Sequence, residues 1–195
     1  MRLRAPLACF AAVLALAAGA CSGDGGGTSG GSDPRAWTVN LCEALSAWVR
    51  DLENRAASLE GEARKGAEKR GARGVRDALV TFTEDVVQLS ATMRADLAAA
   101  GVPDVEDGAG LRRDVLTAVD ELVAIFESFR AELRGLPIND RDAFLQALED
   151  WEARGEAAFA AVERTFEEID EKHDAPAINQ ALAEEEACAS FREQD

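Results

Sequence analysis

The sequence predicts an all-α fold, an antiparallel up-and-down four-helix bundle with a short fifth helix at the C-terminal end. Apolar residues recur every three or four positions over most of the 195-residue chain, which is the period of an amphipathic helix. No segment shows the alternation of apolar and polar residues that is typical of a strand. Because four of the helical segments are long and the turns between them are short, antiparallel neighbours are the expected arrangement.

The first helix is expected to begin at Pro34, with Asp33 as its cap. Its apolar face consists of Trp37, Leu41, Leu45, Trp48, Leu52 and Leu59. The segment GEARKGAEKRGARG, residues 61–74, is charged and interrupted by glycines. We therefore expect this segment to be a frayed helix end followed by a turn.

The second and third helices have the most regular apolar spacing. The face of the second is Val75, Leu79, Phe82, Val86, Leu89, Met93 and Leu97. Gly101 and Pro103 are expected to end it. The face of the third is Leu111, Val115, Val119, Leu122, Phe126, Phe129, Leu133 and Leu136. Pro137 is expected to stop this helix.

Two further helices complete the predicted fold. Asn139 is the expected cap of the fourth. Its apolar face is Leu145, Leu148, Trp151, Phe159, Val162, Phe166 and Ile169. Asp174 and Pro176 are expected to open the shorter fifth helix. Its apolar residues are Ile178, Leu182, Cys188 and Phe191.

Residues 1–20 have the pattern of an export signal. Arg2 and Arg4 precede an apolar run of 14 residues that ends at Ala20. A run of this length is shorter than the ~20 residues that a membrane-spanning helix needs, and it fits the apolar core of a signal peptide. Residues 22–34 are rich in glycine and serine, which is typical of a flexible linker.

The residues Ala18, Gly19, Ala20 and Cys21 resemble the lipobox of bacterial lipoproteins, although Ala18 stands where leucine is usual. The resemblance implies that Cys21 begins the mature protein and carries lipid on its sulfur and its N-terminus. The protein is then anchored to the cell membrane on its extracytoplasmic side. Residues 21–34 form the lipidated N-terminus and linker, and residues 35–195 form one helical domain. The alternative is a secretory signal cleaved after Ala20 that leaves Cys21 unmodified.

Two cysteines remain once Cys9 is removed with the signal and Cys21 is lipidated. In an exported domain the pair Cys42 and Cys188 favours a disulfide, which would close a loop of 147 residues. A bond at this position places the fifth helix across the base of the bundle, unless the helices are offset differently. A bridge between two chains is the third arrangement, and a monomer is favoured.

Charge limits the partners. Removal of residues 1–20 leaves 19 basic and 37 acidic side chains, a net charge of −18. This balance argues against nucleic-acid binding and against attraction of the body to anionic lipid. The lipid on Cys21 is therefore the expected membrane contact. A solubilising surface is favoured over an acidic face for a cationic partner.

No catalytic, cofactor or metal site is predicted. His173 is the one histidine, and it has helical spacing with Asp170, but both are expected to be solvated at a charged helix end. The acidic run at residues 183–187 lacks the spaced oxygen ligands of a calcium loop. No serine has an evident base as a helical neighbour.

The remaining signals concern binding. Trp48 and Trp151 lie on apolar faces, and Gly155 lies one turn beyond Trp151, where a glycine could leave room for an apolar ligand. Ordinary close packing is the favoured interpretation of this glycine. Phe191 could contribute to a groove for a partner. The sequence therefore favours a membrane-tethered interaction protein with an envelope partner. The alternative is a carrier or sensor of a small apolar or cationic ligand, and an enzyme is favoured least.

Overall fold

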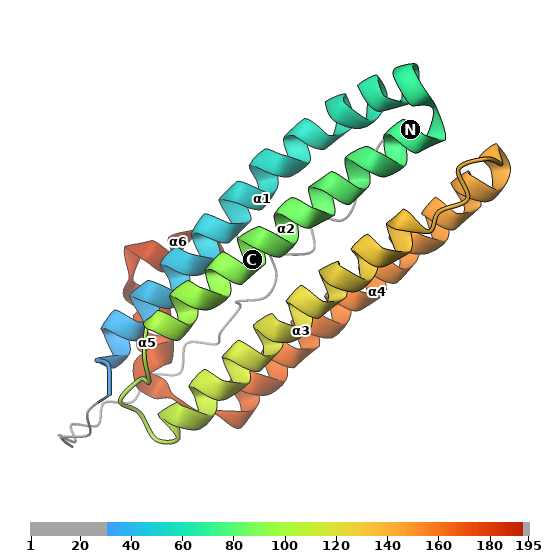
Figure 1. The fold of residues 1–195 in the computed structure, drawn as a ribbon. Helices are drawn as coiled ribbons and strands as arrows, with labels where there is room; N and C mark the ends of the chain where they lie inside the picture. Colours follow the sequence, from blue (N-terminus) through green and yellow to red (C-terminus); the bar gives the residue numbers. More distant parts are fainter. Residues whose placement is uncertain (1–30, 193–195) are drawn as a thin grey trace.

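The computed structural model describes residues 31–192, and these residues form a bundle of four long helices (Figure 1). The long helices are α1 (Pro34–Arg70), α2 (Ala72–Ala99), α3 (Gly108–Arg134) and α4 (Arg141–Lys172). They are followed by α5 (Pro176–Glu184), a 3-10 turn η2 (Glu186–Cys188) and α6 (Ala189–Arg192). Consecutive long helices pack side by side and run in opposite directions. The predicted all-α bundle with a short fifth helix is confirmed.

The core runs along the inside of the bundle and is best filled by α3. All eight residues predicted for the apolar face of this helix are buried. Near the base, Nε1 of Trp48 donates a hydrogen bond of 3.0 Å to Oγ of Ser90, which sets α1 against α2 inside the core. At the opposite end a smaller cluster surrounds Leu79, Leu133 and Phe144.

Helix α4 lies at the margin of this core. Of its predicted apolar face only Val162 and Ile169 are fully buried, whereas Trp151, Phe159 and Phe166 are partly exposed. The spacing of the apolar residues identified the inward face correctly. The depth of burial depends on which helices cover that face, and α4 packs mainly against α3.

The predicted turn within residues 61–74 is confirmed at Gly71, but the predicted frayed helix end before it is wrong. Helix α1 continues to Arg70, and Gly71 alone, with φ of 60°, reverses the chain into α2. The glycines that suggested a break allow the two helices to touch, because a Cβ atom on Gly74 would lie 2.0 Å from the carbonyl oxygen of Gly66. Uninterrupted, the 37 residues of α1 are about 55 Å long.

The chain enters the bundle at its base, beside the loop that joins α2 to α3. The backbone N–H of Ser32 donates to the carbonyl oxygen of Val102 (2.7 Å), and the N–H of Asp104 donates back to Ser32 (2.8 Å). Oγ of Ser32 also donates to the carbonyl oxygen of Ala100. The prediction that a flexible linker extends to Pro34 is therefore wrong for its last residues, because the α2–α3 loop holds Ser32 by these hydrogen bonds.

Side-chain caps begin both α1 and α4. Asp33 caps α1 as predicted, because its Oδ1 accepts the N–H of Ala36. Asp140, not the predicted Asn139, caps α4 and accepts the N–H groups of Asp142 and Ala143. Asparagine and aspartate are equally good caps, so the sequence alone did not distinguish Asn139 from Asp140. The extended backbone of Asp140 places its carboxylate over the first turn.

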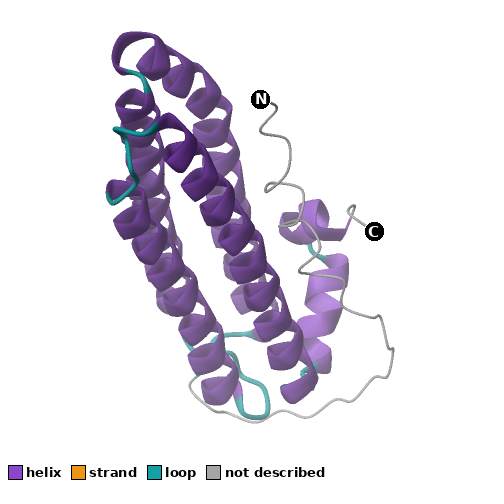
Figure 2. Cartoon of the chain, turned by 90° about the vertical axis from the view of Figure 1, so that its right-hand side faces the viewer, coloured by secondary structure: helices purple, strands orange, loops and turns teal. Residues whose placement is uncertain are grey.

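Helix α5 lies outside the four long helices, against one flank (Figure 2). The prediction that it crosses the base is wrong. It turns back beside the first turns of α1, with Ile178, Ala181 and Leu182 buried, and η2 then carries the chain over Cys42. Cys42 itself lies eight residues, about 12 Å, into α1, so the rise of α5 brings Cys188 to its level.

Within the described residues, no helix has both the length and the apolar character needed to cross a membrane.

Candidate functional site

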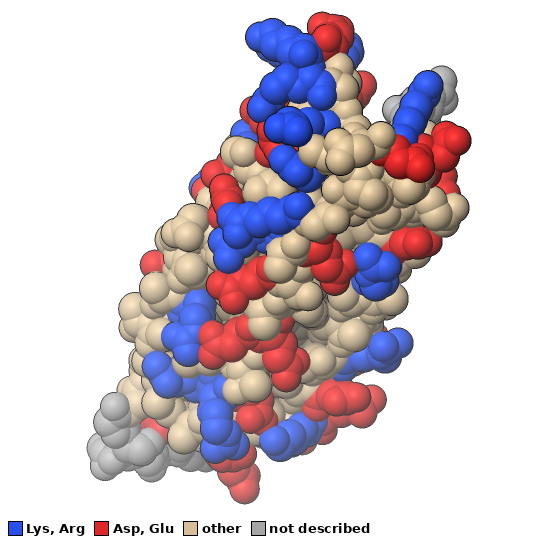
Figure 3. Space-filling view, turned by 45° about the vertical axis from the view of Figure 1, so that its right-hand side comes forward, with Lys and Arg blue, Asp and Glu red and all other residues tan. Residues whose placement is uncertain are grey.

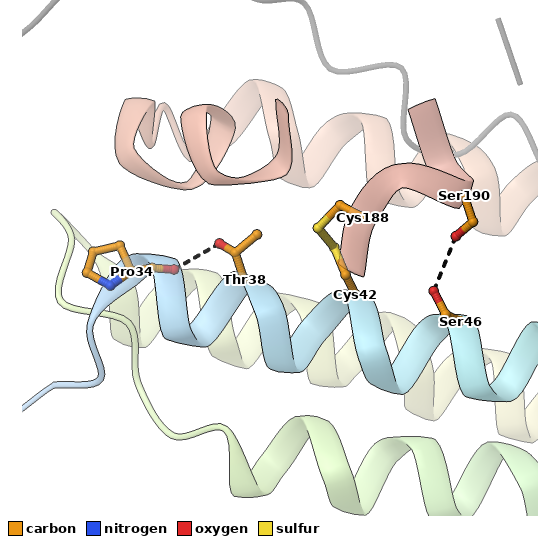
Figure 4. The surroundings of a disulfide bond; sticks show 6 residues. All are labelled: Pro34, Thr38, Cys42, Ser46, Cys188 and Ser190. Carbon is orange, nitrogen blue, oxygen red and sulfur yellow. Dashed lines mark hydrogen bonds between the residues drawn. A yellow bond between two sulfur atoms is a disulfide. The ribbon is translucent and has the colours of Figure 1, made fainter. Parts of the chain in front are cut away.

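The disulfide between Cys42 and Cys188 joins the C-terminal segment to α1 (Figure 4). The two Cα atoms are 5.1 Å apart, and the two residues are 0% and 1% exposed. This confirms the predicted pairing within one chain. On one side of it Arg35 pairs with Glu185, and on the other the hydroxyl groups of Ser46 and Ser190 are 3.3 Å apart.

A second polar cluster joins the end of α4 to the start of α3. The prediction of a solvated Asp170–His173 pair is wrong, because the His173 side chain is 3% exposed and its partner is Asp114. Nε2 of His173 and Nζ of Lys172 lie 2.8 and 2.6 Å from the same carboxylate oxygen of Asp114. Nδ1 of His173 lies 3.5 Å from Oδ2 of Asp107.

The charges of this cluster complement one another. The hydrogen bonds from Lys172 and His173 lower the pKa of Asp114 well below its usual range. Asp114 is therefore an ionised acceptor, and Nε2 of His173 is the protonated ring nitrogen. Both histidine nitrogens face carboxylates rather than a hydroxyl or thiol nucleophile. The cluster thus fastens two helix ends, and the charge of Lys172 also offsets the negative end of the α4 dipole.

Replacement of Asp114 by asparagine tests whether this polar cluster stabilises the fold. We expect Asp114→Asn to lower the free energy of unfolding at pH 7 by about 1–2 kcal/mol, because a partly buried carboxylate loses its charge-assisted hydrogen bonds. The pKa of Asp114 is lower in the folded than in the unfolded state. The stabilisation is thus complete above about pH 4 and is lost as the pH falls further.

Urea unfolding of the wild type and the variant between pH 2 and pH 7 measures the difference. It should be largest at pH 7 and shrink below pH 4. Asp120→Asn is the control, because Asp120 lies on the same helix as Asp114 but forms an exposed ion pair with Arg94 of α2. Its loss should cost less than about 1 kcal/mol. Equal losses for the two variants at pH 7 would contradict a special role for Asp114.

The position predicted to leave room for a ligand lies beside aromatic rings. A Cβ atom on Gly155 would be 3.8 Å from the ring of Phe129, which is an ordinary contact distance. Phe129 in turn packs edge-on against Trp151, with ring centroids 5.7 Å apart. Nε1 of Trp151 is buried and has no hydrogen-bond acceptor among residues 31–192. An unsatisfied buried donor of this kind costs about 1–3 kcal/mol.

The acidic run at residues 183–187 makes local contacts. Glu185 pairs with Arg35, and Glu184 accepts a hydrogen bond from Gln180. In the part of the chain that the structure describes, no group of three or more histidine, cysteine, aspartate or glutamate side chains is placed to hold a metal ion.

The end of the α1–α2 hairpin carries a cluster of basic side chains that the sequence reasoning missed. We call it the basic tip, and its members are Arg64, Lys65, Lys69, Arg70, Arg73 and Arg76. Figure 3 shows Lys and Arg side chains gathered at this end of the molecule. The sequence did contain a signal for it, because the segment predicted to be frayed holds five of these six basic residues. A continuous α1 and a one-residue turn bring these charges together.

No protein-family model matches the chain, and no curated protein or solved structure is detectably similar to it. The predicted lipidation site Cys21 and the side chain of Phe191 lie outside what the structure describes.

Proposed function

We propose that the protein is a lipid-anchored lipoprotein of the bacterial cell envelope and that its helical bundle is a non-enzymatic interaction module. One observation carries the proposal. The chain enters at the base, where Ser32 is bonded to the α2–α3 loop, and the α1–α2 and α3–α4 turns lie at the other end (Figure 1). A tether at Cys21 would thus hold the base and present the far end to a partner.

The dimensions of the molecule support this arrangement. Nine residues separate Cys21 from Gly31, so the base can lie at most about 35 Å from the anchored residue. The α1 helix adds about 55 Å from Pro34 to Arg70. The bundle is therefore a rod long enough to expose its far end well beyond the lipid headgroups.

The clusters at the base support a structural role for the polar groups found there. Asp114, Lys172 and His173 satisfy one another, and Cys42 and Cys188 are joined in a buried disulfide. These groups bind one another and hold the helices together. A partner would therefore contact the outer surface of the rod.

Replacement of Cys21 tests the anchor. In the source bacterium we expect the wild-type protein in the membrane fraction, with diacylglycerol attached to Cys21. We expect Cys21→Ala to be released into the soluble extracytoplasmic fraction, because lipid is then absent and the acidic body is repelled by anionic membranes. Fractionation and mass spectrometry of the N-terminal peptide measure both effects.

Ser22→Ala is the matched control and should remain in the membrane. An unmodified Cys21 on a soluble exported protein would contradict the anchor and the proposed location together.

A carrier of a small ligand is the second candidate, and the buried Nε1 of Trp151 favours it. A ligand that offers a hydrogen-bond acceptor beside Phe129 and Gly155 would satisfy this donor. Native mass spectrometry of protein isolated from its host would then detect a bound small molecule.

A further inference from the structure

We propose that the basic tip binds a phosphate-rich anionic polymer outside the membrane. The proposal rests on the proposed function for its location, and it names the partner class of the interaction module. It is carried by the charge distribution, the unpaired cations and the one-residue turn that closes the hairpin.

The tip reverses the charge of the rest of the protein. Residues 64–76 contain six basic side chains and one acidic side chain, Glu68, a net charge of +5. The remainder of the chain from Cys21 onward carries −23. A polyanion is therefore attracted to one end of the rod and repelled by its body, which gives the contact both a place and a direction.

Most cations of the tip are not neutralised by acidic neighbours. Arg70 and Arg76 both pair with Asp77. The others are exposed and make no ion pair among the described residues, and these are Arg64, Lys65, Lys69 and Arg73. Among the arginines that the structure describes outside the tip, most are paired, as Arg94 is with Asp120 and Arg154 with Glu132.

The titration of Asp77 reports the local positive potential. The hydrogen bond from Arg76, with the charges of Arg76, Arg70 and Arg73, lowers the pKa of this carboxyl group. One carboxylate is thus surrounded by three guanidinium groups, which leaves an excess of positive charge for an external anion.

The backbone holds these cations in a narrow space. Gly66 and Gly74 let the two helices touch, and Gly71 closes the hairpin in one residue. Cations from α1 and α2 therefore converge on one convex end without a flexible loop between them. Arginine matches phosphate in a two-pronged hydrogen-bonding geometry, and four of the six tip residues are arginines.

The position of the tip favours a polymer over the membrane surface. It lies at the far end of the rod from Ser32 and Pro34, where the tether would begin. Contact with the anchoring membrane would require the rod to lie flat. Its acidic sides would then be pressed against anionic lipid, which is electrostatically unfavourable.

Charge reversal at the tip tests the proposal. The probe is linear polyphosphate of about 100 units, titrated into the full mature protein at 50 and 200 mM salt. We expect Lys65→Glu with Arg73→Glu to weaken binding at least about tenfold, and the wild-type affinity to fall steeply with salt. Both side chains are exposed, so the melting temperature should remain unchanged.

Arg50→Glu with Arg164→Glu is the matched control, because it makes the same change in net charge at two exposed arginines outside the tip, of which Arg50 pairs only with its sequence neighbour Asp51. It should weaken binding less than about threefold. Equal losses in the two double variants, or no binding of polyphosphate, would overturn the proposal. Tighter binding to polyglutamate or to vesicles of anionic lipid than to polyphosphate would also overturn it.

Binding to polyphosphate is measured in solution, so it is independent of whether Cys21 carries lipid. If the protein fails to bind polyphosphate but stays anchored in the membrane, the proposed polymer partner is wrong and the proposed anchored interaction module still stands. If the wild-type protein is found free of membranes but still binds polyphosphate, the proposed anchor is wrong and the proposed binding site still stands.

Discussion

Loss of the Cys42–Cys188 disulfide is expected to free the chain after Asp174 and to lower the melting temperature by about 5–15 °C. The bond closes a separation of 146 residues, for which the chain-entropy model gives about 5 kcal/mol and practice often gives less. Helix α5 has only nine residues, which is marginal for a helix alone in water.

The loss should be local at first. The four long helices have their own core, whereas α5 contributes three buried residues, Ile178, Ala181 and Leu182. Amide exchange should therefore accelerate mainly after Asp174 and near the first turns of α1, which α5 covers. Fast exchange along all four helices would instead show that the disulfide is needed for the bundle itself.

The experiment compares the wild type with Cys42→Ala together with Cys188→Ala. Ser46→Ala is the control, because it removes the adjacent hydroxyl contact with Ser190 and leaves the disulfide intact. The control should change the free energy of unfolding by less than about 1 kcal/mol. Peptide mapping without reductant should recover one Cys42–Cys188 linked peptide from a monomer.

The helices and their inward faces were predictable because the underlying pattern is local. Apolar spacing in α3 identified eight residues, from Leu111 to Leu136, that are all buried. The cap at Asp33 and the cysteine pair were also predictable, because each depends on the identity of one or two residues. Such signals persist whatever the rest of the chain does.

Features that depend on two distant segments were not predictable. His173 is buried because Asp114 lies 59 residues away in sequence and 2.8 Å away in space. The basic tip escaped notice because glycine is a poor helix former, and Gly66 and Gly74 therefore suggested a break. They are tolerated because each faces the other across the helix pair.

The placement of α5 was a problem of geometry rather than of propensity. The sequence identified its opening at Pro176 and its disulfide partner. Its direction depended on how far Cys42 lies above the base and on the break at Glu185, whose extended backbone separates α5 from η2.

Alanine in place of Gly74 is expected to destabilise the protein, although alanine favours a helix over glycine by about 1 kcal/mol. The new Cβ atom would lie 2.0 Å from the carbonyl oxygen of Gly66 and 2.3 Å from its carbonyl carbon. Both are backbone atoms, so no side-chain rotation relieves the overlap. The helices must separate at the tip, which we expect to cost up to about 3 kcal/mol and to exceed the gain in propensity.

Gly61→Ala is the matched control, because Gly61 lies within helix α1, as Gly74 lies within α2, and a Cβ atom there would have no neighbour within 4 Å. It should raise the free energy of unfolding by up to about 1 kcal/mol, so the same substitution has opposite signs at two positions 13 residues apart. Thermal unfolding of both variants measures the signs. If Gly74→Ala is as stable as the wild type, the helices do not touch there. If it is destabilised and also binds polyphosphate more weakly, the backbone contact that permits an unbroken hairpin is also what concentrates the cations of the basic tip.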